Sequence, residues 1–220
     1  MKITAISDSH NQHMIIPTKY LTGGDCIIHS GDVSSRGGKN EIRIFLNWFS
    51  KLPYKYKIFI AGNHDFFFEQ APEYEIDALL AEYPEVIYLN DSSIEIEGFK
   101  IHGSPVTPWF HNWAFNRKGD EIVKHWGLIP LDVDILITHG PIYGHLDVTL
   151  EGKKTGCPYL LEKIKELTNL KYFQFGHIHE ARGYFKFADG LLIANASLLD
   201  RDYEMVFYPY VIDTDTWTII

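Results

Sequence analysis

Two histidines, His177 and His179, lie one residue apart in the stretch FQFGHIHEARG, residues 173–183. In an extended strand, side chains two residues apart point to the same face, so both imidazoles could bind one object, whereas a loop would not preserve that geometry. Taken alone, the pair fits two partly exposed polar residues at a strand end better than two metal ligands. The rest of the chain has to decide between these interpretations.

Polar residues of metal-binding types follow five apolar runs that are typical of buried strands. Because ligands of open α/β sheets gather at the carboxyl ends of the strands, the five loops can converge on one point. The set contains no sulfur, which argues against a structural zinc site and for a catalytic site of the manganese, iron, zinc or magnesium type. Burying so many ionisable groups without a cation would be costly. The two aspartates, one asparagine and four histidines are Asp8, His10, Asp32, Asn63, His139, His177 and His179.

The elements that must position this set form an alternating series of strands and helices. Short β-branched runs bounded by turn residues predict buried strands, and apolar residues at i, i+3, i+4 and i+7 predict amphipathic helices. The alternation predicts an α/β fold. The expected strands cover residues 2–7, 25–30, 56–62, 133–139 and 172–175, and the expected helices cover residues 39–52, 72–84 and 157–169, with another beginning near Gly119.

The sequence also contains two hairpin signals. Apolar and polar residues alternate through residues 92–104 around Glu97-Gly98, and through residues 182–197 around Asp189-Gly190. A glycine at such a position suits the tight turn between two antiparallel strands. Antiparallel strands are therefore expected beside the parallel ones.

Length and composition favour one globular domain. The chain has 220 residues, 45% hydrophobic and 22% charged, which is ordinary for such a domain. A formal charge of −9 without a Lys/Arg cluster argues against long nucleic acid as a partner. No apolar run approaches the roughly 20 residues that span a bilayer, so a cytoplasmic protein without membrane contact is expected. Cys26 and Cys157 fit reduced thiols and receive no chemical role.

The ordered series D-x-H, G-D, G-N-H-D, H-G and G-H-x-H, which spans residues 8–179, resembles the calcineurin-like metallophosphoesterases without a substitution. The stretches LPYKYKIFIAGNHDF, IHGSPVTPWF with WAFN, LITHGPIYGHLD and IANASLL are further similar to the small metallophosphoesterase-domain branch, which includes class III cyclic-nucleotide phosphodiesterase-like enzymes. The resemblance implies a four-layer βαββα sandwich, with two mixed β-sheets flanked by helices, as a single domain over residues 1–220.

The resemblance also implies a dinuclear metal centre. Manganese is favoured for the two divalent ions, and iron, zinc, magnesium, cobalt or nickel would also suit these ligands. Asp8, His10 and His179 would hold the first ion, Asn63, His139 and His177 the second, and Asp32 would bridge both.

His64 is left without a metal in this assignment. As an imidazolium it could stabilise developing charge and protonate the departing oxygen, with Asp65 accepting a hydrogen bond from its far nitrogen. The alternative for His64 is a residue that merely caps the loop. Both His64 and Asp65 are therefore candidate catalytic residues.

Candidate substrate contacts include Asn63 and His64 and extend into the aromatic segment that contains Trp109, Phe110 and Trp113. A base could stack on such rings, although they could equally serve as core or loop anchors. Polar contacts from Asn112 and His111 and, among the remaining histidines, from His145 complete the candidates.

The expected function is therefore metal-dependent phosphodiester hydrolysis on a small phosphoester substrate such as a cyclic or other nucleotide, by hydroxide attack on phosphorus. A phosphomonoesterase or nuclease of the same fold is an alternative. A non-catalytic phosphate-binding or scaffold relative is another, but such a relative should lack a ligand or His64. The oligomeric state stays open.

Overall fold

Two six-stranded sheets form the centre of the protein in the computed structural model, which describes residues 1–220. The first sheet has the order β14-β13-β1-β2-β3-β4 and the second the order β11-β12-β10-β9-β6-β5. Each sheet combines parallel and antiparallel pairs, as expected. The strands of the first sheet are β1 (Lys2–Ile6), β2 (Gly24–Ser30), β3 (Tyr54–Ile60), β4 (Val86–Tyr88), β13 (Tyr210–Asp213) and β14 (Thr218–Ile219). Those of the second are β5 (Ser92–Ile96), β6 (Phe99–Ser104), β9 (Ile135–Thr138), β10 (Tyr172–Phe175), β11 (Gly183–Lys186) and β12 (Leu192–Asn195).

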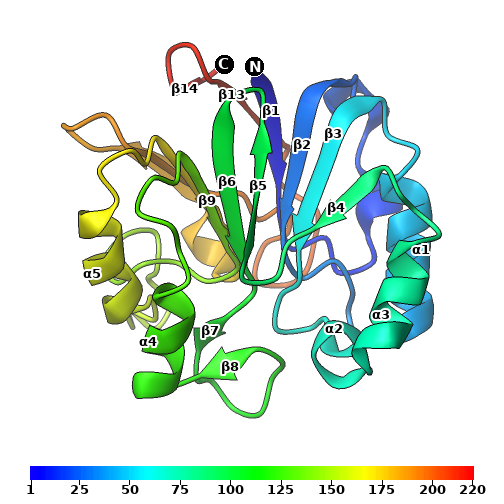
Figure 1. Ribbon diagram of the computed structural model, residues 1–220, viewed down its shortest axis with the longest axis horizontal. Coiled ribbons are helices and arrows are strands. Elements are labelled where there is room, and N and C mark those ends of the chain that lie inside the picture. The colour runs from blue at the N-terminus through cyan, green and yellow to red at the C-terminus, as the bar shows by residue number, and fades with distance from the viewer.

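Helices cover the outer face of each sheet (Figure 1). On the first sheet lie α1 (Lys39–Phe49), α2 (Phe66–Gln70) and α3 (Glu73–Leu80), and on the second lie α4 (Asp120–Trp126) and α5 (Pro158–Glu166). The remaining elements are the short pair β7 (Thr107–Pro108) and β8 (Asn116–Arg117), and the 3-10 turns η1 (His13–Ile15), η2 (Thr18–Tyr20) and η3 (His179–Ala181). None of the helices has both the length and the apolar character that a membrane span requires.

Three buried apolar clusters lie between these four layers. Because alternate residues of a strand face opposite sides, Ile27 of β2 packs with Phe45 of α1, whereas Ile28 joins the cluster between the sheets. The third cluster joins α4 and α5 to the second sheet. The expected four-layer sandwich with two mixed sheets is therefore confirmed.

The boundaries of the expected helices are shorter in the structure. The helix expected over residues 39–52 ends at Phe49, the one over 72–84 is α3, and the one over 157–169 is α5. The apolar pattern in the sequence extends beyond the C-terminal end of each helix. It does so because Leu52, Tyr83 and Leu167, which lie after the helices, also pack against the core. Both hairpins are confirmed, and Glu97 and Gly98 adopt the positive φ angles of 51° and 80° that a tight hairpin turn requires.

The topology brings the predicted ligand loops to one edge. Strands β1, β2 and β3 run parallel to one another in the first sheet, as do β9 and β10 in the second. The loops after these five strands contain all seven ligand candidates, and the two sheets meet where the loops gather.

Candidate metal centre and active-site pocket

The backbone of the ligand loops adopts an uncommon conformation. Asp8, His10, Asp32 and His177 have φ angles of 52°, 39°, 55° and 70°, in the left-handed region that residues with side chains avoid. Such strain costs about 1–3 kcal/mol per residue and persists where the surrounding structure enforces it, commonly at functional sites. All four of these residues contribute donor atoms to the groups that could hold a metal ion.

Glycines of the sequence motifs allow the loops to approach the carboxylates. A Cβ at Gly176 would collide with Asp8 Oδ2, and a Cβ at Gly62 would collide with Asp32 Oδ1. The glycines of G-H-x-H and G-N-H-D are therefore required by close packing against the two aspartates.

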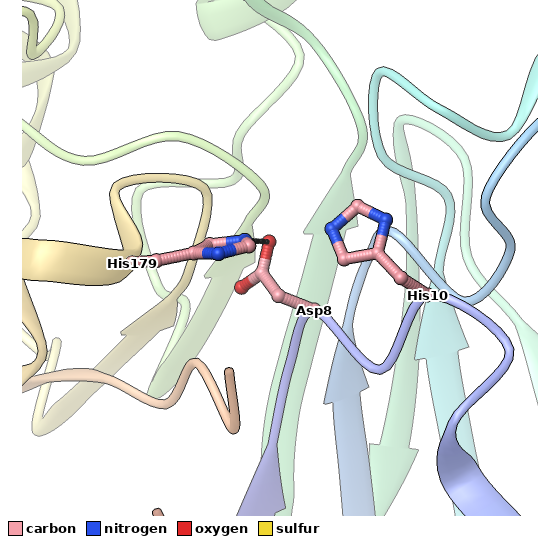
Figure 2. A group of neighbouring side chains, drawn as sticks. All are labelled: Asp8, His10 and His179. Atoms are coloured by element: carbon pink, nitrogen blue, oxygen red, sulfur yellow. Dashed lines mark ion pairs between the residues drawn. The ribbon is translucent and has the colours of Figure 1, made fainter. Parts of the chain in front are cut away.

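The first ligand group consists of Asp8, His10 and His179, whose nearest donor atoms all lie within 4.8 Å of one another. Figure 2 shows these three side chains, two from the loop after β1 and the third from η3. His179 Nε2 lies 3.5 Å from Asp8 Oδ1, and its Nδ1 is 2.8 Å from the carbonyl oxygen of Asp200, to which it donates. This hydrogen bond leaves Nε2 directed at the site.

Asp8 is held by donors from a distant part of the chain. The Ser197 hydroxyl donates to its Oδ2 at 2.6 Å, and the His177 N–H lies 3.1 and 3.0 Å from its two carboxylate oxygens. Ser197 belongs to the IANASLL stretch, so this stretch contacts one of the predicted ligands directly.

The second ligand group consists of Asp32, His139 and His177. His139 Nε2 lies 3.3 Å from Asp32 Oδ2 and 3.0 Å from Asn63 Oδ1, and His139 Nδ1 lies 2.9 Å from the Ser30 carbonyl oxygen, to which it donates. All seven predicted ligands thus lie in or directly beside one of two adjoining groups.

Asp32 also contacts the first group. Its Oδ2 lies 3.5 Å from His10 Nε2, while its Oδ1 accepts a hydrogen bond from the His64 N–H at 2.8 Å. A third group of His10, Asp32 and His64 shares donor atoms with the others. One carboxylate oxygen therefore faces imidazole nitrogens of both ligand groups.

Electrostatics keep the two carboxylates ionised. Burial alone would raise the pKa of Asp8 and Asp32, but the imidazoles beside them, above all His179 for Asp8 and His139 for Asp32, lower both values on balance. Burial would likewise lower the pKa of His139 and His179. In the metal-free protein, however, the nearby carboxylates outweigh burial and raise both pKa values to about 9. Since a cation must displace these protons, metal binding here releases protons.

The residues fit a divalent metal centre. His10 is only 4% exposed, and neither of its ring nitrogens has a hydrogen-bond partner within the protein. An unpaired buried polar group costs about 1–3 kcal/mol, and coordination of a cation would remove that cost. The oxygen and nitrogen donors, with no thiolate, suit a catalytic divalent ion.

His64 borders the ligand groups. Its Nδ1 donates to the Ser35 carbonyl oxygen at 2.9 Å, and its Nε2 lies 4.0 Å from Asp32 Oδ2. Its ring stacks on Trp113 at 4.3 Å between centroids and meets His10 edge-on at 4.6 Å. The ring is thus fixed with Nε2 toward the centre.

The predicted hydrogen bond between Asp65 and His64 is wrong. The buried Asp65 carboxylate instead accepts from the N–H groups of Val33, Ser34 and Gly62 and from the Ser34 hydroxyl, at 2.5–3.2 Å. The turn of the G-N-H-D loop directs Asp65 into the protein, so the Ser35 carbonyl orients His64. Burial, with the Asp32 charge, raises the pKa of Asp65 to about 6.

A cavity of about 430 Å³ opens over the ligand groups. Two segments of the chain contribute most of the remaining lining, one with Pro108, Trp109, Phe110 and Trp113, and one with Thr149, Lys153, Lys154 and Thr155. Trp109 and Phe110 are 50% and 54% exposed, so their rings are accessible to a ligand in the cavity.

Three of the polar candidates lie outside the lining of this cavity. Asn112 and His111 are exposed, and His145 packs against Phe185 and Phe187 instead. The lining also includes residues that the sequence did not indicate, among them the two lysines and Tyr203. The Tyr203 ring lies 4.9 Å from that of His10 and 5.2 Å from that of His179. No motif marks the lysines and Tyr203, because they come from loops that approach the site only in the fold.

Comparison with known proteins agrees with this geometry. The family model described as calcineurin-like phosphoesterase matches residues 1–181. Human metallophosphoesterase domain-containing protein 1 is 38% identical, over 98% of this chain and 71% of its own length, and a UPF0046 protein of Caenorhabditis elegans is 33% identical over 97% and 80%.

Solved structures share the fold at lower identity. A protein of Thermus thermophilus matches with a TM-score of 0.64 at 16% identity, covering 100% of this chain and 96% of its own. An archaeal phosphodiesterase matches with a TM-score of 0.51 at 18% identity, covering 100% and 98%. The motif series, the ligand geometry and the family match together show that the chain belongs to the calcineurin-like phosphoesterases.

Proposed function

We propose that the chain is a dinuclear metal-dependent phosphodiesterase that acts on small phosphodiesters, such as cyclic or other nucleotides. The position of Asp32 carries this proposal, because its Oδ2 lies 3.5 Å from His10 Nε2 and 3.3 Å from His139 Nε2. One oxygen that faces both ligand groups suits a bridge between two cations. Asp8, His10 and His179 would hold one ion, Asn63, His139 and His177 the other, and Asp32 would serve both.

Manganese is our choice for the metal pair, with iron, zinc, magnesium, cobalt and nickel as the alternatives. When bound, two such cations lower the pKa of a water molecule, so that hydroxide is available near neutral pH, and they neutralise charge on the phosphoryl oxygens.

The chain's own residues position the reaction and supply a proton. His64 is the candidate general acid, because Ser35 holds its Nδ1 and leaves Nε2 directed at the cavity. As the bond between phosphorus and the departing oxygen breaks, the proton on Nε2 passes to that oxygen. Trp113, stacked on the His64 ring, restricts its orientation.

The composition of the cavity lining supports a diester over a monoester. A phosphodiester carries two substituents on phosphorus, and the lining includes two segments that could contact them, an aromatic one at residues 108–113 and a polar one at residues 149–155. The exposed faces of Trp109 and Phe110 suit a flat apolar group such as a base. A cavity of about 430 Å³ is in the size range of small-molecule sites.

A metal-reconstitution assay tests the proposed function. The protein is stripped with a chelator, each divalent metal is added separately, and turnover of bis(p-nitrophenyl) phosphate, p-nitrophenyl phosphate and cyclic nucleotides is measured with the number of bound ions. We expect no turnover after stripping, recovery with manganese, two ions per chain, and higher kcat/KM for the diesters.

Three outcomes would overturn parts of the proposal. One bound ion at full activity would exclude the dinuclear centre, and a higher kcat/KM for the monoester would exclude the diesterase. Two bound ions without turnover of any ester would favour the non-catalytic relative. Asp134→Asn, which changes a carboxylate remote from the site, is the control for nonspecific loss.

A further inference from the structure

The polar segment of the cavity lining, residues 149–155, contains two adjacent lysines. Lys153 and Lys154 line the same cavity as Asp32, His64 and the histidines of both ligand groups. Asp32 is the only acidic side chain of that lining. The proposed function uses this segment only as a polar surface for one substituent and gives the two positive charges no role, so the charges require a further explanation.

The loop that carries the lysines is fixed by hydrogen bonds. Residues 148 and 154 pair as an antiparallel bridge, the Thr149 N–H donates to the Lys153 carbonyl at 2.9 Å, and Gly152 makes the turn with a φ of 74°. At its base, the buried Asp147 accepts from the N–H groups of Gly144 and Gly156 at 2.8 and 3.1 Å. The two side chains therefore start from a defined backbone.

Contacts also fix this loop against the metal centre. The Leu150 N–H donates to Glu180 Oε1 at 3.2 Å, and Glu180 follows the ligand His179 directly. The Lys154 ammonium lies 5.4 Å from the centre of the Tyr143 ring, a cation–π contact that restricts its position. The loop thus keeps its place relative to the ligands.

Neither lysine is paired with a carboxylate. Lys163 and Lys165 pair with Glu166 and Glu162, whereas neither Lys153 nor Lys154 has a carboxylate partner within 4.0 Å. Their place in the lining of the cavity distinguishes them from other unpaired lysines. On a chain with a net charge of −9, two such cations in a cavity lining can attract an anionic ligand.

We propose that Lys153 and Lys154 form a subsite for a second phosphate group, so that the substrates are phosphodiesters that carry a further phosphate on one substituent. This inference rests on the proposed function. The phosphoryl group that reacts would be served by the candidate metal ligands and His64, whereas the lysines belong to a separate segment of the lining and to neither ligand group. A phosphate bound by ammonium groups needs no fixed planar geometry, which suits lysine.

Two matched substrates test the subsite. Thymidine 5′-(p-nitrophenyl phosphate) and its 3′-phosphorylated form share the reacting diester, the base and the leaving group, and differ by one phosphate. We expect the metal-loaded wild type to show a lower KM for the doubly phosphorylated form. Lys153→Ala/Lys154→Ala should raise that KM about ten-fold, as for two exposed charge pairs, and should affect the singly charged substrate much less.

Controls separate the subsite from general electrostatic attraction. Lys51→Ala removes an exposed charge away from the cavity and should leave both substrates unchanged. Lys153→Arg/Lys154→Arg retains the charges and should retain the preference. Calorimetric binding of thymidine 3′,5′-bisphosphate against thymidine 5′-phosphate gives a readout that does not require turnover, and the alanine variant should lose the difference in Kd.

The outcomes distinguish this inference from the proposed function. If the wild type hydrolyses both substrates with equal KM and binds both nucleotides equally, the subsite is excluded while the diesterase stands. If the alanine variant loses equally on both substrates, the lysines contact the reacting phosphoryl group and the second-phosphate subsite is also excluded. If neither substrate is hydrolysed but the bisphosphate binds more tightly through the lysines, the subsite stands and the diesterase fails.

Discussion

At the residue scale, backbone carbonyl groups set the direction of three of the imidazoles at the site. Nδ1 of His64, His139 and His179 each donates to a carbonyl oxygen, which leaves Nε2 directed at the centre. Such outer contacts fix ring orientation before a ligand arrives. His10 is different, because both of its ring nitrogens lack a partner. Individual substitutions should therefore separate metal binding from proton transfer.

The acid role of His64 predicts a dependence on the leaving group. His64→Ala should reduce hydrolysis of an alkyl or nucleoside phosphodiester by about 10²- to 10⁴-fold, because an alkoxide needs a proton to depart. A nitrophenyl diester should lose much less, because nitrophenolate leaves unaided. Turnover of both substrates at equal metal occupancy measures this. An equal loss on the two would instead assign His64 to positioning or charge stabilisation.

The shared position of Asp32 predicts unequal metal loss. Asp32→Asn removes the charged oxygen that faces both ligand groups, so the variant should lose more bound metal and more activity than Asn63→Ala, which removes one neutral donor. Elemental analysis of both purified variants gives the ion content per chain. Similar losses would show that Asp32 serves only one ion.

At the element scale, the loops after β2 and β3 are joined by one buried carboxylate. Asp65 follows the His64 of the second loop and accepts from Val33, Ser34 and Gly62 N–H groups. Since Asp32 lies in one loop and Asn63 in the other, this contact sets the distance between ligands of different strands. Asp65 therefore influences the site indirectly, by holding the backbone of the two loops that carry Asp32 and Asn63.

Replacing that carboxylate should destabilise the protein. Asp65→Asn substitutes an NH2 group for one acceptor oxygen and leaves buried N–H donors unpaired, which should lower the free energy of unfolding by about 2–4 kcal/mol. Urea denaturation of the metal-free protein measures the change. Asp134→Asn, at a partly buried carboxylate that accepts from the Lys100 N–H, provides the comparison. If Asp65→Asn lowers the free energy of unfolding no more than Asp134→Asn does, Asp65 does not hold the two loops together.

At the scale of the whole molecule, the sandwich buries histidines outside the metal centre as well. His13 is fully buried between Phe45 and Trp48, without a partner for either ring nitrogen. Burial lowers its pKa to about 4. The folded chain therefore holds this ring neutral, whereas the unfolded chain protonates it near pH 6.5.

This difference predicts acid destabilisation with a defined sign. Between about pH 6.5 and 4 the unfolded state binds the additional proton, so the free energy of unfolding should fall by about 1.4 kcal/mol per pH unit as the pH is lowered through this range. His13→Leu should remove that part of the slope, and Met14→Leu, at an exposed neighbour, should retain it. Urea titrations of the metal-free proteins from pH 4 to 7 measure both slopes. An unchanged slope in His13→Leu would refute the assignment.

The sequence by itself determined the layers and the ligand set. Strand and helix periodicities are local, so Ile27 and Ile28 already indicate two opposite buried faces of one strand. Residue types set coordination chemistry, so the seven candidate ligands could be predicted from the motifs that follow each strand, and their donor atoms lie in or beside two adjoining groups. The ends of the helices were harder to predict. Leu52 and Tyr83 continue the apolar pattern of the helices before them, although both residues lie beyond the helix ends.

Only the tertiary structure decided which partners complete the site. Ser197 donates a hydrogen bond to Asp8, which lies 189 positions away in the sequence. Lys153 and Tyr203 line the cavity, but they come from loops without a recognisable motif. The true acceptor of the His64 Nδ1 proton is a backbone carbonyl, and every residue has one, so sequence cannot indicate which. Side-chain type is encoded locally, whereas the direction of a side chain depends on backbone turns that distant packing enforces.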